Sequence, residues 1–158
     1  MPERQDSLDQ LDQLGQSDQS GRLFIVGDIH ACPGELERLL SALSLQTEDR
    51  LVCLGDYIDR GPDAKAVVDL LLGMRADNLC SFTFLKGNHE DMFLDFLGYE
   101  GLHGHAFLMN GGEQTIASYN CDSLTPGNEI ALAMPEAHRE FFLDLKLLFI
   151  KIRFMELD

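Results

Sequence analysis

Three short apolar runs dominate the pattern of hydrophobic and polar positions along the chain. They cover residues 23–26, 51–54 and 82–85. A continuous apolar run of this length is typical of a strand that is buried on both faces of a parallel sheet. Each run leads into a polar segment with a glycine at or near its start, and a helical pattern follows. We therefore predict the same strand, loop and helix unit three times.

The segments after these runs carry apolar residues at helical spacing. Pro33 and Glu35 open the first helix, whose leucines stand at positions 36, 39, 40 and 43. Pro62 opens the second, with apolar residues from Ala66 to Met74, and residues 91–96 resume helically after the third run. Alternating strands and helices of this kind predict an α/β fold with a parallel sheet and right-handed crossovers.

The pattern is weaker after Gly98. Residues 101–105 are predicted as a loop, residues 111–119 as a short helix led by glycine, and residues 126–127 as a turn. A further helix is expected to begin at Pro135 and to turn three apolar side chains inward, namely Phe141, Phe142 and Leu145. Residues 148–154 alternate in polarity and predict one more strand.

The length and charge of the chain restrict its class. The 158 residues suffice for one domain, which we assign to residues 22–158; residues 1–21 are polar and are expected to be a disordered tail. The net charge of −15 argues against nucleic-acid binding. No apolar run approaches the roughly 20 residues that cross a bilayer, and the N-terminus lacks a signal-peptide pattern. We expect a cytoplasmic protein without membrane contact.

The four cysteines form no C-x-x-C pair, which argues against a zinc knuckle. Cys53 and Cys80 stand in or beside the strand runs and are expected to be buried, reduced thiols.

Carboxylates, imidazoles and an amide gather in the three loops that leave the predicted strands. These candidate residues are Asp28, His30, Asp56, Asp59, Arg60, Asn88 and His89. Loops at the carboxyl ends of parallel strands converge on one edge of the sheet, so we expect these side chains to lie close together. Each group alone is compatible with an ordinary polar turn, but chance rarely produces all three in succession.

Together these residue types predict a site with two divalent metal ions. Asp28, His30 and Asp56 would bind the first ion, and Asp56 and Asn88 the second. Carboxylate and imidazole ligands, with further oxygen donors, suit Mn, Fe or Zn better than Ca. Two ions roughly 3.5–4 Å apart clamp a phosphate group and activate water for in-line attack. Such a pair would also supply the positive charge that an acidic protein needs to hold an anionic substrate.

The remaining candidates fit the other steps of phosphoester hydrolysis. His89 is expected to protonate the leaving alcohol, and Asp59 to orient and charge its imidazole. The planar guanidinium of Arg60 is expected to bind phosphate oxygens. Asn88 is expected to contact the same phosphate group.

The three loop segments carry a resemblance to a known family. Residues 27–30, 55–61 and 87–90 resemble the signature motifs of the calcineurin-like metallophosphoesterases, and more narrowly those of the bacterial and phage Ser/Thr phosphoprotein phosphatases. Residues 110–119 are also similar to the bacterial group. The resemblance covers roughly residues 22–148. It implies a β-sandwich flanked by helices, a dinuclear metal centre that often holds Mn, and hydrolysis of phosphomonoesters in phosphorylated proteins or small molecules.

A related branch cleaves symmetrical dinucleoside tetraphosphates, and its third motif usually ends in Asp. Glu90 therefore favours the protein phosphatase branch. Ala31 stands where the family usually has glycine. The family also has two further metal-ligating histidines and a second phosphate-binding arginine in its C-terminal half, and their motifs are missing from this chain.

We therefore expect a C-terminally truncated domain that holds only the N-terminal βαβαβ half and its helices. An inactive remnant that binds metal or a partner is the alternative to an active enzyme. The other three histidines are expected to be surface residues rather than replacement ligands; they are His103, His105 and His138.

Overall fold

The computed structural model describes residues 21–149. The predicted N-terminal tail lies outside the described residues except for Gly21, as does the predicted strand from residue 150 onward. Leu148 and Phe149 are described and do not belong to a strand, so that prediction is wrong for these two positions. In the described part of the chain, no helix has the length and apolar character needed to cross a bilayer.

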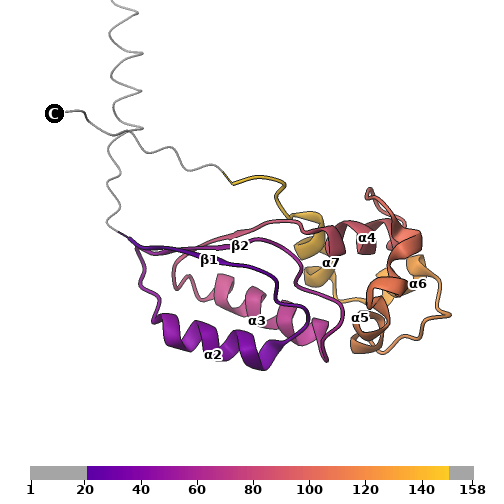
Figure 1. Ribbon diagram of the computed structural model, residues 1–158, viewed down its shortest axis with the longest axis horizontal. Coiled ribbons are helices and arrows are strands. Elements are labelled where there is room, and N and C mark those ends of the chain that lie inside the picture. The colour runs from indigo at the N-terminus through magenta and orange to yellow at the C-terminus, as the bar shows by residue number, and fades with distance from the viewer. Residues whose placement is uncertain (1–20, 150–158) are drawn as a thin grey trace, which may run out of the picture.

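Three parallel strands form one sheet, which confirms the α/β prediction. They are β1 (Leu23–Val26), β2 (Arg50–Cys53) and β3 (Ser81–Phe84), in the order β1-β2-β3. The apolar runs locate the strands to within one residue. The register pairs Val26 with Cys53 and Cys53 with Phe84, so the three strands end level with one another. Their following loops consequently leave from the same edge of the sheet (Figure 1).

Helices α2 (Pro33–Leu43) and α3 (Ala64–Ala76) lie along one face of this sheet (Figure 1). The leucine pattern predicted the first helix correctly. The second begins two residues after Pro62, because the Asp63 side chain accepts a hydrogen bond of 2.9 Å from the Ala66 N–H and caps the helix.

The second half of the described chain is helical and lies beyond the carboxyl ends of the strands (Figure 1). Its elements are α4 (Asn88–Leu97), η1 (Gly104–Ala106), η2 (Leu108–Asn110), α5 (Gly112–Ser118), α6 (Gly127–Ala133) and α7 (Glu136–Leu143). Helix α4 begins at Asn88 rather than at Asp91, so the third candidate loop ends as the first turn of a helix. Helix α6 replaces a predicted turn, since Ile130 is buried against the rest of the domain.

An aromatic cluster joins the sheet to this helical half. The ring of Tyr57 lies 5.5 Å from that of Phe141, and the Phe93 ring lies 5.2 Å from that of Phe142, measured between centroids. The Tyr57 hydroxyl donates a 2.8 Å hydrogen bond to the Leu85 carbonyl. Because Tyr57 directly follows the candidate residue Asp56, this packing fixes the second loop from behind. Both Cys53 and Cys80 are buried, as predicted.

His138 corrects one prediction: it is buried rather than at the surface, with only 2% of the residue exposed. Its Nδ1 accepts a hydrogen bond from the Tyr119 hydroxyl, and its Nε2 donates to the Asp69 carboxylate, both at 2.9 Å. The side chain thereby connects α7 to α3 and to the end of α5. His103 and His105 are exposed, as expected.

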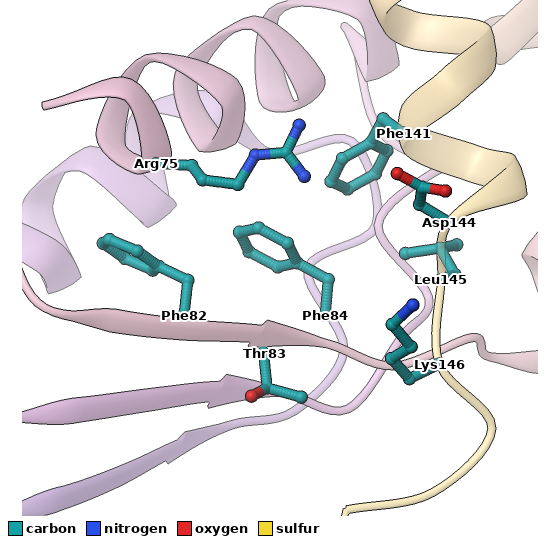
Figure 2. Close-up of a pocket in the computed structure, with 8 residues that line it drawn as sticks. All are labelled: Arg75, Phe82, Thr83, Phe84, Phe141, Asp144, Leu145 and Lys146. Atoms are coloured by element: carbon teal, nitrogen blue, oxygen red, sulfur yellow. The ribbon is translucent and has the colours of Figure 1, made fainter. Parts of the chain in front are cut away.

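A pocket of about 290 Å³ lies along the outer edge of β3 (Figure 2). Phe82 and Phe84 form one wall, and Lys146 continues the sheet through a single bridge to Leu85. None of the predicted site residues lines this pocket; they follow the carboxyl ends of the strands instead.

Candidate metal-binding and catalytic site

The buried carboxylate of Glu90 connects two of the three loops. Its Oε2 accepts hydrogen bonds from the Asp56 N–H at 2.8 Å and the Gly87 N–H at 3.0 Å, and its Oε1 accepts one from the Tyr57 N–H at 2.7 Å. Burial raises the pKa of Glu90 to about 7, although the three N–H donors oppose the shift. The loop after β2 is therefore attached to the first turn of α4 through one side chain.

Glycines allow these loops to approach each other closely. A Cβ atom on Gly55 would lie 2.3 Å from the Gly87 nitrogen, and a Cβ on Gly87 would lie 2.1 Å from Oδ1 of Asp56. In the same way, a Cβ on Gly61 would lie 2.0 Å from the His30 carbonyl oxygen. The glycines of the motifs therefore make room for a neighbouring loop.

Five non-glycine residues around the site have positive φ angles. They are His30 (44°), Ala31 (53°), Asp56 (53°), Asp59 (68°) and Arg60 (67°). Such conformations are strained for L-residues and gather at functional sites. Ala31 is fully buried at the position where the family usually has glycine, which adopts this conformation without strain.

The ring of His30 is held in one orientation. Its Nδ1 lies 2.9 Å from the Ile58 carbonyl oxygen, which can only accept, so Nδ1 carries the proton. The Nε2 lone pair then faces the site, where it accepts a 3.0 Å hydrogen bond from Nη1 of Arg60. The carboxylate of Asp28, which is largely exposed, lies 3.7 Å from the same Nε2.

His89 and Asp59 form a buried pair. The Nδ1 of His89 donates a 2.7 Å hydrogen bond to Oδ2 of Asp59. The other ring nitrogen, Nε2, takes no part in this hydrogen bond. The other oxygen of Asp59 accepts a 2.6 Å hydrogen bond from the Thr115 hydroxyl. Burial raises the pKa of Asp59, and the hydrogen bonds from Thr115 and His89 act in the opposite direction. This geometry can orient an imidazole for proton transfer.

His30, Asp56 and His89 each offer one ligand atom, and these atoms lie within 4.8 Å of one another. Two imidazoles and a carboxylate are donors that suit Mn, Fe or Zn, and the fixed His30 lone pair points to such use. The donor set therefore fits a divalent metal ion. In both histidines, Nδ1 is hydrogen-bonded to an oxygen: the Ile58 carbonyl for His30 and the Asp59 carboxylate for His89. Metal-binding histidines typically have one ring nitrogen held in this way.

The structure thus brings the predicted ligands His30 and Asp56 together with His89, which was predicted as the acid. The third predicted ligand of the first ion, Asp28, lies beside His30 but outside this group. Asn88 is exposed at the start of α4 and lines a pocket of about 810 Å³. Arg60 is exposed on the same side of the site as His30.

The sequence alone predicts no role for Thr115 or Ile58, and for Glu90 it indicates only the branch of the family. The position of Thr115 within residues 110–119, the segment similar to bacterial phosphatases, was the signal for the first. No signal in the sequence indicates that the Ile58 carbonyl fixes His30, because that contact depends on backbone direction.

Comparison with known proteins supplies independent information. A family model described as calcineurin-like phosphoesterase matches residues 21–145. Serine/threonine-protein phosphatase 2 of Escherichia coli (strain K12) is 39% identical over 92 residues, which cover 58% of this chain and 38% of that protein. An asymmetrical bis(5'-nucleosyl)-tetraphosphatase of Oceanobacillus iheyensis is 31% identical over 119 residues, which cover 69% of this chain and 45% of that protein.

A crystal structure that is named as a candidate diadenosine tetraphosphatase matches with a TM-score of 0.52 and 27% identity. The match covers 79% of this chain and 43% of that one. The chain therefore spans less than half the length of these relatives.

Proposed function

Because the chain belongs to the calcineurin-like phosphoesterase family, we propose that its three-loop site hydrolyses phosphomonoesters with the help of divalent metal ions. The observation that carries the proposal is the convergence of His30, Asp56 and the His89–Asp59 pair at the carboxyl edge of one sheet. Phosphorylated serine or threonine in a protein is the substrate class that we favour.

The residues proposed to hold the first ion are Asp28, His30 and Asp56; Asp56 and Asn88 would hold a second. A bound ion would supply positive charge to the phosphate and lower the pKa of water. The fixed Nδ1–H tautomer of His30 supports its role as a ligand, since the Nε2 lone pair can then coordinate a metal ion. Manganese is the metal that we favour, because the resemblance of the three motifs implies it; the nitrogen and oxygen donors by themselves suit Mn, Fe or Zn.

His89 is proposed as the general acid. Its Nδ1 donates to Asp59, and this contact directs Nε2 away from the carboxylate. A proton on Nε2 can then pass to the leaving alcohol. Asp59 is too deeply buried to contact substrate directly, so its proposed role is to orient His89.

Arg60 and Asn88 are proposed to contact the phosphate group. The Arg60 side chain is exposed, and its guanidinium can offer two parallel N–H donors to phosphate oxygens. In the structure one of these donors is engaged by His30, so phosphate binding would release that contact.

The alternative substrate is a dinucleoside tetraphosphate, which the names of two relatives suggest. The third motif ends in Glu90 rather than the Asp that is usual in the tetraphosphatase branch, and this favours a phosphoprotein substrate. Offering a phosphoserine peptide and a dinucleoside tetraphosphate in competition, with Mn present, distinguishes them: the proposal expects the peptide to be hydrolysed preferentially. Preferential cleavage of the nucleotide would replace the substrate class but leave the proposed site intact.

The site itself is tested by hydrolysis of p-nitrophenyl phosphate with Mn at neutral pH. Asp56→Asn and His89→Asn should both lose activity, whereas His105→Asn, a change of an exposed histidine, should not. Equal rates in all four proteins would refute the proposal.

Calorimetry with Mn separates the roles of the two residues. Asp56→Asn should weaken metal binding, whereas His89→Asn should retain it if His89 acts as an acid rather than a ligand. General acid catalysis contributes roughly 10²–10⁴-fold, and its loss should slow esters with poor leaving groups more than p-nitrophenyl phosphate. The calorimetry also gives the number of ions bound per chain. Two ions would contradict the hypothesis that the chain is an inactive remnant, whereas one ion or none would support it.

A further inference from the structure

Thr115 makes two hydrogen bonds with a residue 56 positions away in the sequence. Its hydroxyl oxygen accepts from the Asp59 N–H at 2.9 Å and donates to Asp59 Oδ1 at 2.6 Å. The Thr115 side chain is fully buried. One hydroxyl therefore fixes both the backbone and the side chain of Asp59.

The turn that Thr115 holds is strained. Asp59 and Arg60 are consecutive residues with φ angles of 68° and 67°, and such conformations persist only where the surroundings enforce them. The Arg60 N–H donates a 3.1 Å hydrogen bond to the Gly111 carbonyl oxygen. The two strained backbone N–H groups are thus both bound by the segment from Gly111 to Thr115.

This segment is itself fixed in place. A Cβ on Gly111 would lie 2.9 Å from Cγ of Arg60, so glycine permits the close approach. At the other end of α5, the Ser118 hydroxyl donates to the Thr115 carbonyl oxygen at 2.7 Å and accepts from the Lys65 N–H at 3.2 Å. Helix α5 is consequently attached both to the strained turn and to α3.

The Thr115 bond determines which oxygen of Asp59 meets His89. A carboxylate has two equivalent oxygens and a broad terminal torsion, so burial alone does not choose between them. With Oδ1 occupied by Thr115, Oδ2 is left for the 2.7 Å hydrogen bond from Nδ1 of His89. A single orientation of the carboxylate then maintains a single tautomer and a single orientation of the imidazole.

We propose that Thr115 is a positioning residue for the Asp59–His89 pair, acting through the strained turn rather than through substrate. This inference rests on the proposed function, in which His89 is the general acid. Thr115 is expected to affect the rate of the chemical step and to leave substrate affinity unchanged.

The test compares Thr115→Val, which keeps the shape and removes the hydroxyl, with Thr115→Ser, which keeps the hydroxyl. The first measurement is the tautomer of His89 in long-range ¹H–¹⁵N spectra of the metal-free protein, which needs no activity. We expect one Nδ1–H tautomer in the wild type and Thr115→Ser, and a mixture in Thr115→Val. A site that shows no hydrolysis at all would contradict the proposed function yet leave this spectroscopic result standing.

The second measurement is steady-state hydrolysis with Mn. Because the lost hydrogen bond involves a charged acceptor, kcat should fall by about tenfold to hundredfold in Thr115→Val with KM unchanged, and Thr115→Ser should remain close to the wild type. If Thr115→Val does not fold, Thr115→Ala serves as the variant without a hydroxyl, with folding verified by thermal melting.

Thr125 offers a matched control. Its hydroxyl makes the same pair of contacts to Asp122, both at 3.3 Å, in an exposed turn. Thr125→Val should leave the His89 tautomer and kcat unchanged. An unaltered His89 tautomer in Thr115→Val would overturn the proposal. So would an equal loss of kcat in Thr115→Ser, because the effect would then come from packing of the Thr115 methyl group.

Discussion

Removal of the Glu90 carboxylate is expected to destabilise the whole domain. Three backbone N–H groups donate to it, and all belong to the candidate site loops: those of Asp56, Tyr57 and Gly87. In Glu90→Ala the Tyr57 N–H would be buried without an acceptor, at about 1–3 kcal/mol, and the partly buried N–H groups of Asp56 and Gly87 would each lose their acceptor at up to that cost. The sum of up to about 9 kcal/mol is comparable with the entire stability of a typical domain, about 5–15 kcal/mol.

Glu90→Gln provides the graded comparison. Its carbonyl oxygen can replace Oε2 and keep the two bonds from Asp56 and Gly87, whereas its NH₂ group would face the Tyr57 N–H, donor against donor. One orphaned N–H predicts a loss of about 1–3 kcal/mol, well below the loss in Glu90→Ala.

Urea unfolding followed by far-UV circular dichroism measures both values. The assay is set at pH 8, because Glu90, whose pKa is raised to about 7, is then mostly ionised in the folded wild type. Amide hydrogen exchange gives the local reading: Glu90→Gln should lose protection at Tyr57 more than at Asp56 or Gly87. Glu140→Gln, a change of an exposed glutamate on α7, is the control and should stay within about 0.5 kcal/mol of the wild type.

A loss below about 1 kcal/mol in Glu90→Ala would refute this reasoning, since even one orphaned N–H should cost that much. So would unchanged protection of all three amides.

Further predictions concern metal affinity and pH. Arg60→Gln removes a cation that contacts His30 Nε2. Like charges about 4 Å apart repel by about 1 kcal/mol even in water, so Mn affinity measured by calorimetry should rise about fivefold, and unchanged affinity would contradict this. Burial lowers the pKa of His138, so the stability that its neutral form supplies is present above pH about 6.5 and lost as pH falls through the lower folded value. Thermal melting from pH 7.5 to 5 should show that loss in the wild type and a smaller one in His138→Gln. The hydrogen bonds from Arg22 lower the pKa of Asp49 to about 2 from the usual 3.8, so its contribution is present above pH 3.8 and lost as pH falls through about 2. Asp49→Asn should flatten that part of the acid titration, and an unchanged acid limb would exclude the role of this pair.

Much of the fold was predictable because its signals are local. Each strand overlaps a short, mainly apolar run, and the leucine spacing after Pro33 marks α2. The convergence of the three candidate loops followed from topology, since parallel strands that end level bring their loops together.

The features that were missed depend on contacts distant in sequence. His138 was predicted at the surface because its helix shows a polar neighbourhood, yet Asp69, which is 69 positions away, pairs with it in the interior. Thr115 and Asp59 are 56 positions apart. The early start of α4 at Asn88 depends on Glu90, whose side chain caps the helix while it binds the preceding loop. Periodicity along the chain contains no information of this kind.

The glycines of the three motifs also have a consequence for how this sequence can change. Gly55, Gly61 and Gly87 each lie against an atom of a different motif rather than of their own. A substitution at any of them would displace a candidate metal ligand or a closely packed turn that belongs to another motif. The three motifs can therefore change only together. In a library of variants that randomises one motif at a time, almost no folded, active protein should carry a change at these glycines. Tolerated changes should appear only in combinations that alter both members of a touching pair.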